Sequence, residues 1–383
     1  MRFSTKALHA GENRHLYQSS VMPPIYMTST FVQEEPGQGE YEYTRAGNPN
    51  FTILESTLAA LEDAQYATVF SSGLGALTAL LSSFKSGDRV VALEGLYGGT
   101  YRLFMQVFQN FDLSIEIIPP HDFNHLKQAL RGACLFCFET PTNPLLDIYD
   151  IKALTDLARS QDVLSLVDST FATPYVQNPL KLGADIVWHS TTKYIGGHSD
   201  TIGGVMMTNK KDIKEKLDFA RKALGVNPSP FDCWLVTRGV KTLAVRMDRH
   251  QANAETLATY FQEQDYVKKV YYPGLSIHPG NAIAAKQMRG FGGMLSLDID
   301  LPTDALKQWL CSLEYFKLAE SLGGVESLIC HPATMTHASI PREERLRLGI
   351  SDQLVRLSVG IEEVEDLIED FNKKAPKLNT ALT

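Results

Sequence analysis

The sequence has few cysteines and no long hydrophobic run. Its 383 residues include five cysteines, and this odd, sparse set does not suit the disulfide framework of a small secreted protein. The longest apolar stretches, such as residues 76–81, are far shorter than the roughly 20 residues of a membrane-spanning helix. The N-terminal sequence MRFSTKALHAGENRH lacks the apolar segment of a secretory signal. We therefore expect a cytoplasmic protein that binds no membrane.

Basic clusters and nucleotide-binding motifs are also lacking. The net charge is −8 and is spread along the chain, so nucleic acid is not an expected partner. A dinucleotide-binding G-x-G-x-x-G would need glycine at position 78, where the chain has Thr78, and no P-loop lysine follows. A nucleotide-binding module is therefore disfavoured. His331 and His337 have no partner at metal-ligand spacing, and no metal site is predicted.

From residue 46 to about residue 245, short apolar runs alternate with helical patterns. A helix is expected to begin near Asn50, with Thr52 and Glu55 as its capping box. The apolar runs do not alternate with polar residues, which is typical of a parallel sheet covered by helices on both faces. The predicted strands are residues 67–70, 89–93, 114–118, 134–138, 163–167 and 186–188. We therefore predict a doubly wound α/β domain over residues 46–245.

The two ends of the chain differ from this middle part. Residues 1–45 are irregular in pattern and predict an arm without a core of its own. A helical segment over residues 242–266 leads into an alternating strand at 292–299. Another strand is predicted at 354–359, and the last helix has an apolar stripe of Ile361, Val364, Leu367, Ile368 and Phe371. We predict a smaller α+β domain over residues 246–383.

Polar or glycine-rich segments follow five of the predicted strands. Ligands of open parallel sheets bind at the carboxyl ends of the strands, so these segments should line one cleft. The segments are residues 71–76, 94–100, 139–144, 168–170 and 189–194. Residues 71–75 open a helix, whose free N–H groups suit a phosphate, and the hydroxyls of Ser190 and Thr192 can add to such a site.

Three further side chains at these strand ends suit pyridoxal phosphate (PLP). Taken alone, Asp168 is best explained as a helix cap or a salt-bridge partner, Lys193 as an exposed lysine and Tyr97 as a core residue. Together they match the needs of this cofactor, which are a Schiff-base lysine, an acid at the pyridinium nitrogen and a phosphate site. Burial in a cleft would also make the Lys193 amine less basic and more nucleophilic.

With these residues in these positions, the sequence resembles the Cys/Met-metabolism family of PLP enzymes, a branch of the aspartate-aminotransferase fold. The segment around the lysine, HSTTKYIGGH at 189–198, is highly specific to that family. Other matching segments, which span nearly the whole chain, are residues 43–49, 71–76, 97–100, 139–144, 167–174, 320–324, 335–339 and 356–363. The resemblance implies the PLP-dependent transferase fold (fold type I), with a large doubly wound α/β domain and a smaller C-terminal α+β domain.

The resemblance also implies roles for individual residues. Lys193 carries the cofactor and then moves protons, Asp168 pairs with the pyridine nitrogen, and Tyr97 stacks on the ring and assists the leaving thiolate. The implied phosphate ligands are Gly73, Leu74, Ser190 and Thr192, with Tyr43 and Arg45 reaching the phosphate of the neighbouring subunit. The implied substrate ligands are Arg356, Ser321 and Asn143 for the carboxylate and Glu320 for a distal ammonium.

The resemblance further implies a carbon–sulfur lyase whose small-molecule substrate is cystathionine or a related sulfur amino acid. Glu320 is shared with γ-lyases and γ-synthases, which favours γ-elimination, with β-elimination close behind. A γ-synthase, which performs γ-replacement on an activated homoserine, stays open. Methionine γ-lyases carry cysteine where Gly99 stands, which argues against that activity.

Two further readings remain open. An aminotransferase of the same fold would lack the segments beginning at Tyr97 and at Lys193. A catalytically silent PLP-binding regulatory protein is the alternative of another class, and the complete set of Lys193, Asp168, Tyr97 and Arg356 argues against it. The family usually forms a homotetramer, a dimer of dimers in which residues 1–45 would clasp the neighbouring subunit.

Overall fold

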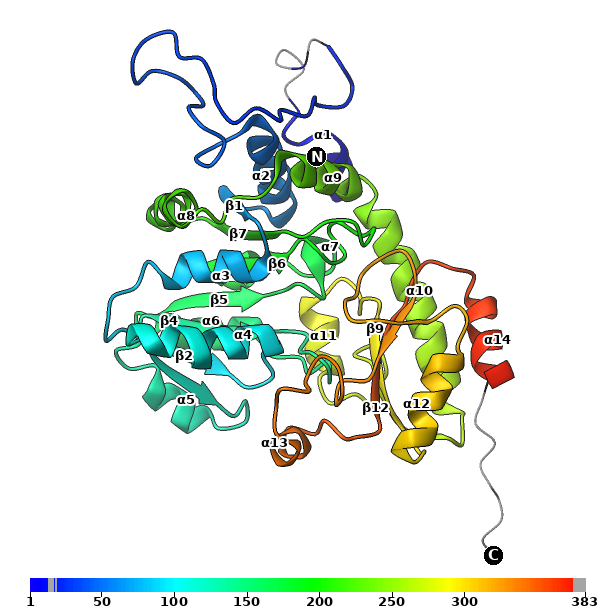
Figure 1. Ribbon diagram of the computed structural model, residues 1–383. Helices are drawn as coiled ribbons and strands as arrows, with labels where there is room; N and C mark the ends of the chain where they lie inside the picture. Colours follow the sequence, from blue (N-terminus) through cyan, green and yellow to red (C-terminus); the bar gives the residue numbers. More distant parts are fainter. Residues whose placement is uncertain (13–16, 18, 375–383) are drawn as a thin grey trace, which may run out of the picture.

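The computed structural model describes residues 1–12, 17 and 19–374. Residues 13–16 and 18 of the predicted arm, and 375–383 of the predicted C-terminal domain, lie outside the described residues. Two sheets, each with helices packed on it, lie side by side, and the long helix α10 (Leu243–Gln262) runs along their junction (Figure 1). Among the residues that the structure describes, none of the helices combines the length and hydrophobicity of a transmembrane span.

The large sheet has seven strands in the order β1-β7-β6-β5-β4-β2-β3. Its strands are β1 (Tyr66–Phe70), β2 (Arg89–Leu93), β3 (Ser114–Ile118), β4 (Leu135–Glu139), β5 (Leu164–Asp168), β6 (Ile186–Ser190) and β7 (Gly204–Thr208). The six predicted strands are confirmed with small shifts of their ends. The seventh strand was missed, and the expectation of a wholly parallel sheet is wrong, because β7 runs antiparallel to both β1 and β6.

The reversal at β7 has a simple cause. Parallel neighbours require a long crossover connection, usually a helix. The described connection between β6 and β7, residues 191–203, consists of turns and contains no helix. The chain therefore turns back on itself, and this tight connection includes Lys193.

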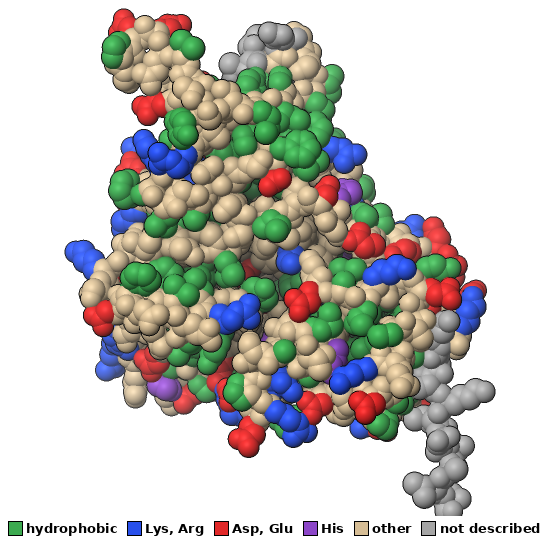
Figure 2. All heavy atoms as spheres, viewed as in Figure 1, with side chains coloured by type: hydrophobic (Ala, Val, Ile, Leu, Met, Phe, Trp, Pro, Cys, Tyr) green, Lys and Arg blue, Asp and Glu red, His purple; other side chains and the backbone are tan. Residues whose placement is uncertain are grey.

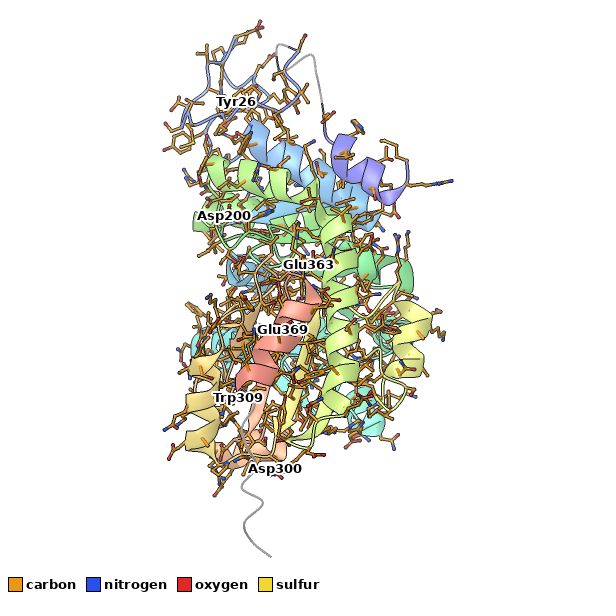
Figure 3. All side chains as sticks on the ribbon, turned by 90° about the vertical axis from the view of Figure 1, so that its right-hand side faces the viewer. Tyr26, Asp200, Asp300, Trp309, Glu363 and Glu369 are labelled. Atoms are coloured by element: carbon orange, nitrogen blue, oxygen red, sulfur yellow. The ribbon has the colours of Figure 1, made fainter. Side chains whose placement is uncertain are left out.

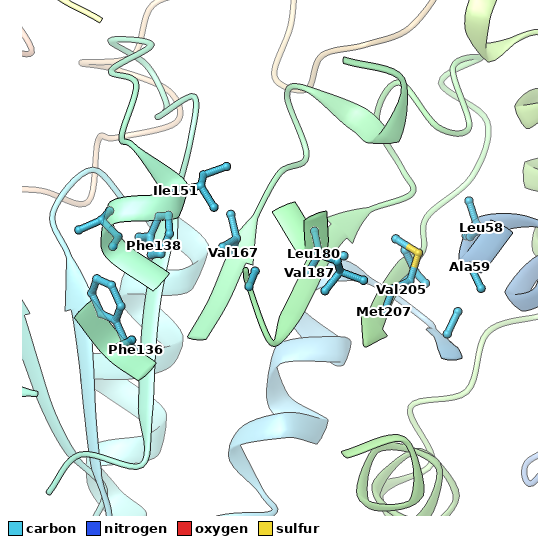
Figure 4. Packing of buried hydrophobic residues seen from close by; sticks show 14 of the residues in the cluster. Leu58, Ala59, Phe136, Phe138, Ile151, Val167, Leu180, Val187, Val205 and Met207 are labelled. Carbon is cyan, nitrogen blue, oxygen red and sulfur yellow. The ribbon is translucent and has the colours of Figure 1, made fainter. Parts of the chain in front are cut away.

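Helices cover both faces of the large sheet, as predicted. They are α2 (Pro49–Glu62), α3 (Gly73–Leu81), α4 (Gly98–Arg102), α5 (Phe123–Ala129), α6 (Ile151–Arg159), α7 (Thr173–Val176), α8 (Lys211–Leu224) and α9 (Pro230–Val240). Alternate strand residues face opposite cores. Phe136 and Phe138 belong to the core that also contains residues of α2 and α6 (Figure 4), whereas Leu135 and Cys137 belong to the core that contains residues of α3 and α8. Each fully buried apolar side chain of this size contributes about 1.5–3 kcal/mol.

The first helix of this domain begins differently from the prediction. The N-cap of α2 is Asn48, whose side-chain oxygen accepts from the Asn50 amide at 2.9 Å, and Pro49 occupies the first turn. The predicted capping box of Thr52 and Glu55 is therefore wrong. Glu55 instead forms an ion pair with Arg221 of α8 at 2.5 Å.

The predicted arm is only partly irregular. Residues 3–9 form helix α1 (Phe3–His9), which packs on α2 and buries Ala7. The following described residues, up to Gly47, are mostly exposed loops that extend from the body of the molecule (Figure 1). Hydrophobic side chains gather on this region in Figure 2, and Val21, Met27 and Val32 are among the exposed ones.

The C-terminal part packs a five-stranded sheet, ordered β10-β11-β12-β9-β8, against α10 and further helices. Its elements are β8 (Val267–Tyr271), α11 (Asn281–Gln287), β9 (Met294–Ile299), α12 (Thr303–Ser312), β10 (Lys317–Leu318), β11 (Leu328–Cys330), α13 (Arg342–Arg347), β12 (Leu354–Ser358) and α14 (Val364–Lys374). Figure 3 shows α14 running alongside α10, with Trp309 of α12 nearby.

Two details of the C-terminal prediction are wrong. The alternation at residues 292–299 suggested a half-buried strand, but β9 is buried on both faces. Leu295 and Leu297 face the core of this part, while the Ser296 hydroxyl donates to the Pro144 carbonyl of the large-sheet part at 2.7 Å. In addition, Ile361 precedes α14 and is partly exposed, rather than belonging to its apolar stripe.

Candidate active site

A cavity of about 360 Å³ lies at the carboxyl ends of β4, β5 and β6, where the C-terminal part meets the large sheet. The face of the molecule seen in Figure 2 is hollowed near its centre. The lining brings together all but two of the predicted site residues, namely Gly73, Leu74, Tyr97, Asn143, Asp168, Ser190, Thr192, Lys193, Glu320, Ser321 and Arg356. Tyr43 and Arg45 are the two that lie elsewhere.

Lys193 occupies the tight turn after β6. Its amide bonds to the Ser190 carbonyl at 3.3 Å, and its own carbonyl accepts from the Gly197 amide at 2.8 Å. Its amine donates to the Ser321 hydroxyl at 3.0 Å. Burial and the nearby Arg356 charge lower the pKa of Lys193 to about 8, although Glu320 opposes this shift. A larger share of this amine is therefore unprotonated at neutral pH than in an exposed lysine.

Ser321 supports both the lysine and the arginine of the site. Its backbone has φ +98, in a region that non-glycine residues rarely adopt. Its hydroxyl accepts from Lys193, and its carbonyl accepts from Arg356 Nη2 at 2.8 Å. Residues held in such conformations cluster at functional sites, where the surroundings maintain them.

Asp168 ends β5 next to a second buried acid, Glu139, with which it pairs in the strand register. The Oδ1 atom of Asp168 accepts from the Thr170 amide at 2.9 Å and from its hydroxyl at 2.5 Å. Burial raises the pKa of Asp168, while the two bonds from Thr170 oppose the rise. Burial and the Asp168 charge hold the pKa of Glu139 well above its ordinary value. A cationic ligand beside Asp168 would stabilise its ionised form.

Glu139 begins one of the predicted strand-end segments, residues 139–144, but was not predicted as a site residue. The structure shows that its Oε2 atom accepts from the Tyr97 amide at 2.9 Å. It thereby fixes the segment that presents the Tyr97 ring, which is 40% exposed. A side chain at Gly99 would place its Cβ atom 2.4 Å from the Tyr97 ring. Any residue larger than glycine at that position would therefore force the ring to move.

The start of α3 is the segment predicted to bind the phosphate. Ser72 caps the helix by accepting from the Gly75 amide at 2.9 Å. Ser72, Gly73 and Leu74 line the cavity, and the amides at the start of a helix suit an anion. A Cβ atom at Gly73 would lie 3.2 Å from that of Ser190, so glycine permits this close approach. The Thr192 hydroxyl donates to the Gly203 carbonyl at 3.2 Å and lines the same cavity.

Arg356 lies on β12 and is buried. Its Nη1 atom donates to the Asn143 Oδ1 atom at 2.9 Å, while its Nε atom has no partner among the described residues. No carboxylate in the described part of the chain lies within 4.0 Å of its guanidinium. A buried cation without an acid is costly, and a carboxylate ligand would relieve that cost by a two-point contact.

Tyr43 and Arg45 lie on the arm, away from the cavity of their own chain. The Arg45 guanidinium lies 5.6 Å from the centre of the Tyr43 ring and donates to the Lys222 carbonyl at 2.8 Å. Tyr43 is exposed. Their predicted contact with a neighbouring subunit remains a prediction.

The sequence profile of the Cys/Met metabolism PLP-dependent enzymes matches residues 4–375. The chain belongs to this family. The resemblance inferred from the motifs is thereby confirmed, and this Cys/Met-family member is a PLP-dependent enzyme.

Individual relatives carry different names at similar identity. The chain is 46% identical over 379 residues to "Cystathionine gamma-lyase" of Dictyostelium discoideum, with 98% of each chain covered. It is 47% identical over 375 residues to "Cystathionine beta-lyase" of Lactococcus lactis subsp. cremoris, covering 97% of this chain and 98% of the relative. The crystal structure of cystathionine gamma synthase from Xanthomonas oryzae pv. oryzae in complex with cystathionine matches with a TM-score of 0.95 at 41% identity, covering 98% and 97%. The predicted fold type I is thus confirmed.

The cavity of this family member fits PLP on three observations. Lys193 supplies an amine of lowered pKa, and Asp168 supplies a buried acid that a cationic ring nitrogen would stabilise. The close approach of Gly73 to Ser190 leaves helix amides and hydroxyls together for a phosphate. The amine, the acid and the phosphate-binding groups line one cavity but belong to separate elements. PLP requires such an arrangement, because its aldehyde, its ring nitrogen and its phosphate each need a different partner.

A second cavity, of about 520 Å³, lies beside the first in this Cys/Met-family member. The two share Asn143 in their linings. In the lining of the second cavity, Arg347 of α13 forms an ion pair with Glu94 at 2.5 Å and another with Glu344 of its own helix at 2.7 Å. Its lining includes neither Lys193 nor any other predicted residue except Asn143, so the chemistry belongs to the smaller cavity.

Proposed function

We propose that this PLP enzyme is a carbon–sulfur lyase that acts on cystathionine, with γ-elimination as its main reaction. The observation that carries the proposal is one cavity holding three groups, namely the Lys193 amine, the buried Asp168 and the Arg356 guanidinium, for which the described residues supply no acidic partner. An amino-acid substrate offers a carboxylate to the arginine and its α-carbon to the lysine. Relatives named γ-lyase, β-lyase and γ-synthase lie at similar identity, so the choice among them rests on Glu320.

PLP, when bound, supplies the electron sink for negative charge that develops at the substrate α-carbon. Asp168 would hold the pyridine nitrogen of the bound cofactor in its protonated form, because a carboxylate favours a neighbouring cation. Arg356 binds the substrate carboxylate and fixes the α-carbon beside the Lys193 amine. Because its pKa is lowered to about 8, this amine can take the Cα proton near neutral pH and then move a Cβ proton.

Tyr97 is the residue we propose to protonate the leaving sulfur. Its ring lies at the cavity, and its backbone is held by Glu139. In γ-elimination, cystathionine and water give cysteine, 2-oxobutyrate and ammonia. In β-elimination the other carbon–sulfur bond breaks, and the products are homocysteine, pyruvate and ammonia. Lys193, Tyr97 and Arg356 would act in both reactions, so they do not by themselves determine which carbon–sulfur bond breaks.

The γ assignment rests on the resemblance to γ-lyases and γ-synthases at Glu320, and the position of this residue suits cystathionine as the substrate. It lines the cavity but is itself exposed, which places a negative charge at the open rim. Its charge also acts on Lys193, whose pKa it raises against the larger effect of burial. A carboxylate at this position suits the distal ammonium group of cystathionine.

We also propose a cytoplasmic homotetramer in which the arm of residues 1–45 clasps a neighbouring subunit. The exposed apolar residues Val21, Met27 and Val32 of the arm support this assembly. Tyr43 and Arg45, which do not reach their own cavity, would contact the cofactor phosphate of the neighbour. The proposed domains are the arm, residues 46–245 and residues 246–383. Sedimentation of the wild type and of a chain lacking residues 1–45 tests this assembly, because the shortened chain should not form the tetramer.

The test of the proposed activity is product analysis with cystathionine as sole substrate for the PLP-loaded enzyme. 2-Oxobutyrate with cysteine would support γ-elimination and the role of Glu320. Pyruvate with homocysteine would identify a β-lyase and show that Glu320 does not decide the bond. No keto acid would favour the synthase, tested with an activated homoserine and cysteine. PLP binding without turnover of any of these would favour the silent regulatory protein. The Lys193→Ala variant is the control, and it should form no keto acid from cystathionine.

A further inference from the structure

One face of α10 carries three buried polar side chains, Arg246, His250 and Asn253. Their spacing of four and three positions places them on one side of the helix, and their exposed fractions lie between 0% and 4%. Each of them bonds to backbone carbonyls of segments outside α10. Those segments are the turn after Lys193 and the chain directly after β12, which carries Arg356.

Arg246 holds the turn that contains Lys193. Its Nη1 atom donates to the carbonyl of Tyr194, the residue directly after the lysine, at 2.7 Å. Its Nη2 atom donates to the carbonyls of Gly239 at 2.9 Å and Ile195 at 3.4 Å. In the described part of the chain no carboxylate lies within 4.0 Å of Arg246. Carbonyl dipoles thus supply the compensation that a buried cation needs.

The turn itself is shaped around this guanidinium. Gly197 has φ +75, and a Cβ atom there would lie 2.1 Å from Arg246 Nη1. Burial lowers the pKa of Arg246 to about 10, so the side chain is still charged at neutral pH. The position of the backbone after Lys193 is therefore tied to α10 by a charged side chain that donates to two carbonyls of that segment, those of Tyr194 and Ile195.

His250 and Asn253 hold the segment that directly follows β12. His250 Nδ1 lies 2.7 Å from the Val359 carbonyl, and burial lowers the pKa of this ring to about 4. The neutral ring must therefore donate from Nδ1. Asn253 Nδ2 donates to the carbonyls of Gly360 at 3.1 Å and Glu362 at 2.8 Å. Val359 directly follows β12, so these bonds fix the end of the strand that carries Arg356.

We propose that this face of α10 sets the spacing between the Lys193 amine and the Arg356 guanidinium, with Arg246, His250 and Asn253 as positioning residues. The helix is continuous over these positions and runs along the junction of the two parts (Figures 1 and 3). Proton transfer requires the amine and the substrate carbon in near-contact geometry, and a misplacement of about 1 Å can reduce rate about 10²-fold. The inference rests on the proposed function, since it concerns the same lysine and arginine.

Substitutions at the two ends of this α10 face should change different kinetic parameters. Arg246→Met loosens the lysine turn, so kcat for cystathionine should fall about 10–100-fold with little change in KM. Asn253→Leu loosens the end of β12, so KM should rise about tenfold with a smaller change in kcat. In the cofactor-free protein, hydrogen exchange should accelerate in residues 191–197 for the first variant and in residues 356–362 for the second.

Two control variants separate positioning from general loss of stability. Arg345→Met removes another buried arginine, which bonds to Asp352 and to the Ile340 carbonyl. Arg249→Met removes an exposed arginine of α10, which pairs with Glu363. Both controls should leave exchange in residues 191–197 unchanged. If Arg246→Met does not fold, Arg246→Lys keeps the charge but not the planar fork, and it should show the same pattern more weakly.

Equal changes in kcat and KM for both α10 variants, or unchanged exchange in residues 191–197 for Arg246→Met and Arg246→Lys, would overturn the inference. The exchange measurement needs neither cofactor nor substrate. A wild-type enzyme that forms no keto acid from cystathionine would therefore contradict the proposed function, while the exchange pattern would still decide whether α10 holds the two segments.

Discussion

Arg356 Nη1 and Asn143 Oδ1 are joined by a hydrogen bond of 2.9 Å, which connects β12 to the turn after β4. The bond orients a guanidinium that the described residues leave without an acidic partner. A planar fork held in this way can meet a carboxylate at two points, which a lysine ammonium cannot do.

The first prediction concerns this fork. Arg356→Lys keeps the charge but loses the paired contact, and charge-assisted hydrogen bonds contribute about 1.5–3 kcal/mol. The KM for cystathionine should rise about 10–100-fold, with kcat less affected, as measured by steady-state keto acid formation. Arg249→Lys on the exposed side of α10 is the matched control. An unchanged KM would remove Arg356 from the substrate site.

The second prediction follows from the pKa of Lys193, which is lowered from 10.5 to about 8. Only the unprotonated amine can attach the cofactor aldehyde, so attachment to the cofactor-free protein should speed up with rising pH and level off above about pH 8. Stopped-flow absorbance measures this rate. A midpoint near 10.5 would mean that the lysine is not desolvated.

The same shift has a consequence for stability. Between about pH 8 and 10.5 the unfolded chain holds this proton and the folded chain does not, so stability increases with pH across that window. Below about pH 8 the full cost of burying the ammonium is present. The cofactor-free wild type should therefore gain stability relative to Lys193→Met as the pH rises through this window, which denaturant titration at several pH values can measure.

The third prediction concerns Asp168. Asp168→Asn keeps the side-chain shape but removes the charge that stabilises a protonated ring nitrogen, so kcat should fall about 10²–10³-fold. Asp185→Asn is a control, because Asp185 precedes the amino end of β6 and bonds to Ser165. If both variants lose the same activity, the effect of Asp168 is structural rather than electrostatic.

The fourth prediction concerns Glu320 at the rim of the cavity. Glu320→Gln removes the charge proposed to face the distal ammonium group of cystathionine, and KM for this substrate should rise about tenfold. The KM for homocysteine, which has no distal ammonium, should change little. A similar change for both substrates would show that Glu320 acts through Lys193 or the fold.

The positions of the proposed catalytic groups could be predicted because they follow apolar strands. A run such as residues 163–167 identifies a strand, and the carboxyl ends of parallel strands meet at one edge. Lys193, Asp168 and Ser190 could therefore be assigned to one cleft. Arg356 and Ser321 could be assigned only through the family resemblance, because they come from the other sheet and approach the cleft through tertiary packing.

Other features had no local signal in the sequence. The strand β7 was missed because nothing in residues 191–203 shows that the connection turns back. The polar residues Arg246, His250 and Asn253 would ordinarily indicate a solvated helix face, yet they are buried. Glu139 was overlooked as a site residue because its bond to the Tyr97 amide depends on how two loops meet.

The most direct test of the account is to identify the lysine that carries the cofactor. PLP-loaded protein is reduced with borohydride, digested and mapped by mass spectrometry. The account predicts the pyridoxyl mass on the peptide that contains Lys193, and its absence from the Lys193→Ala protein. The same mass on a peptide containing another lysine, with Lys193 unmodified, would contradict the central assignment.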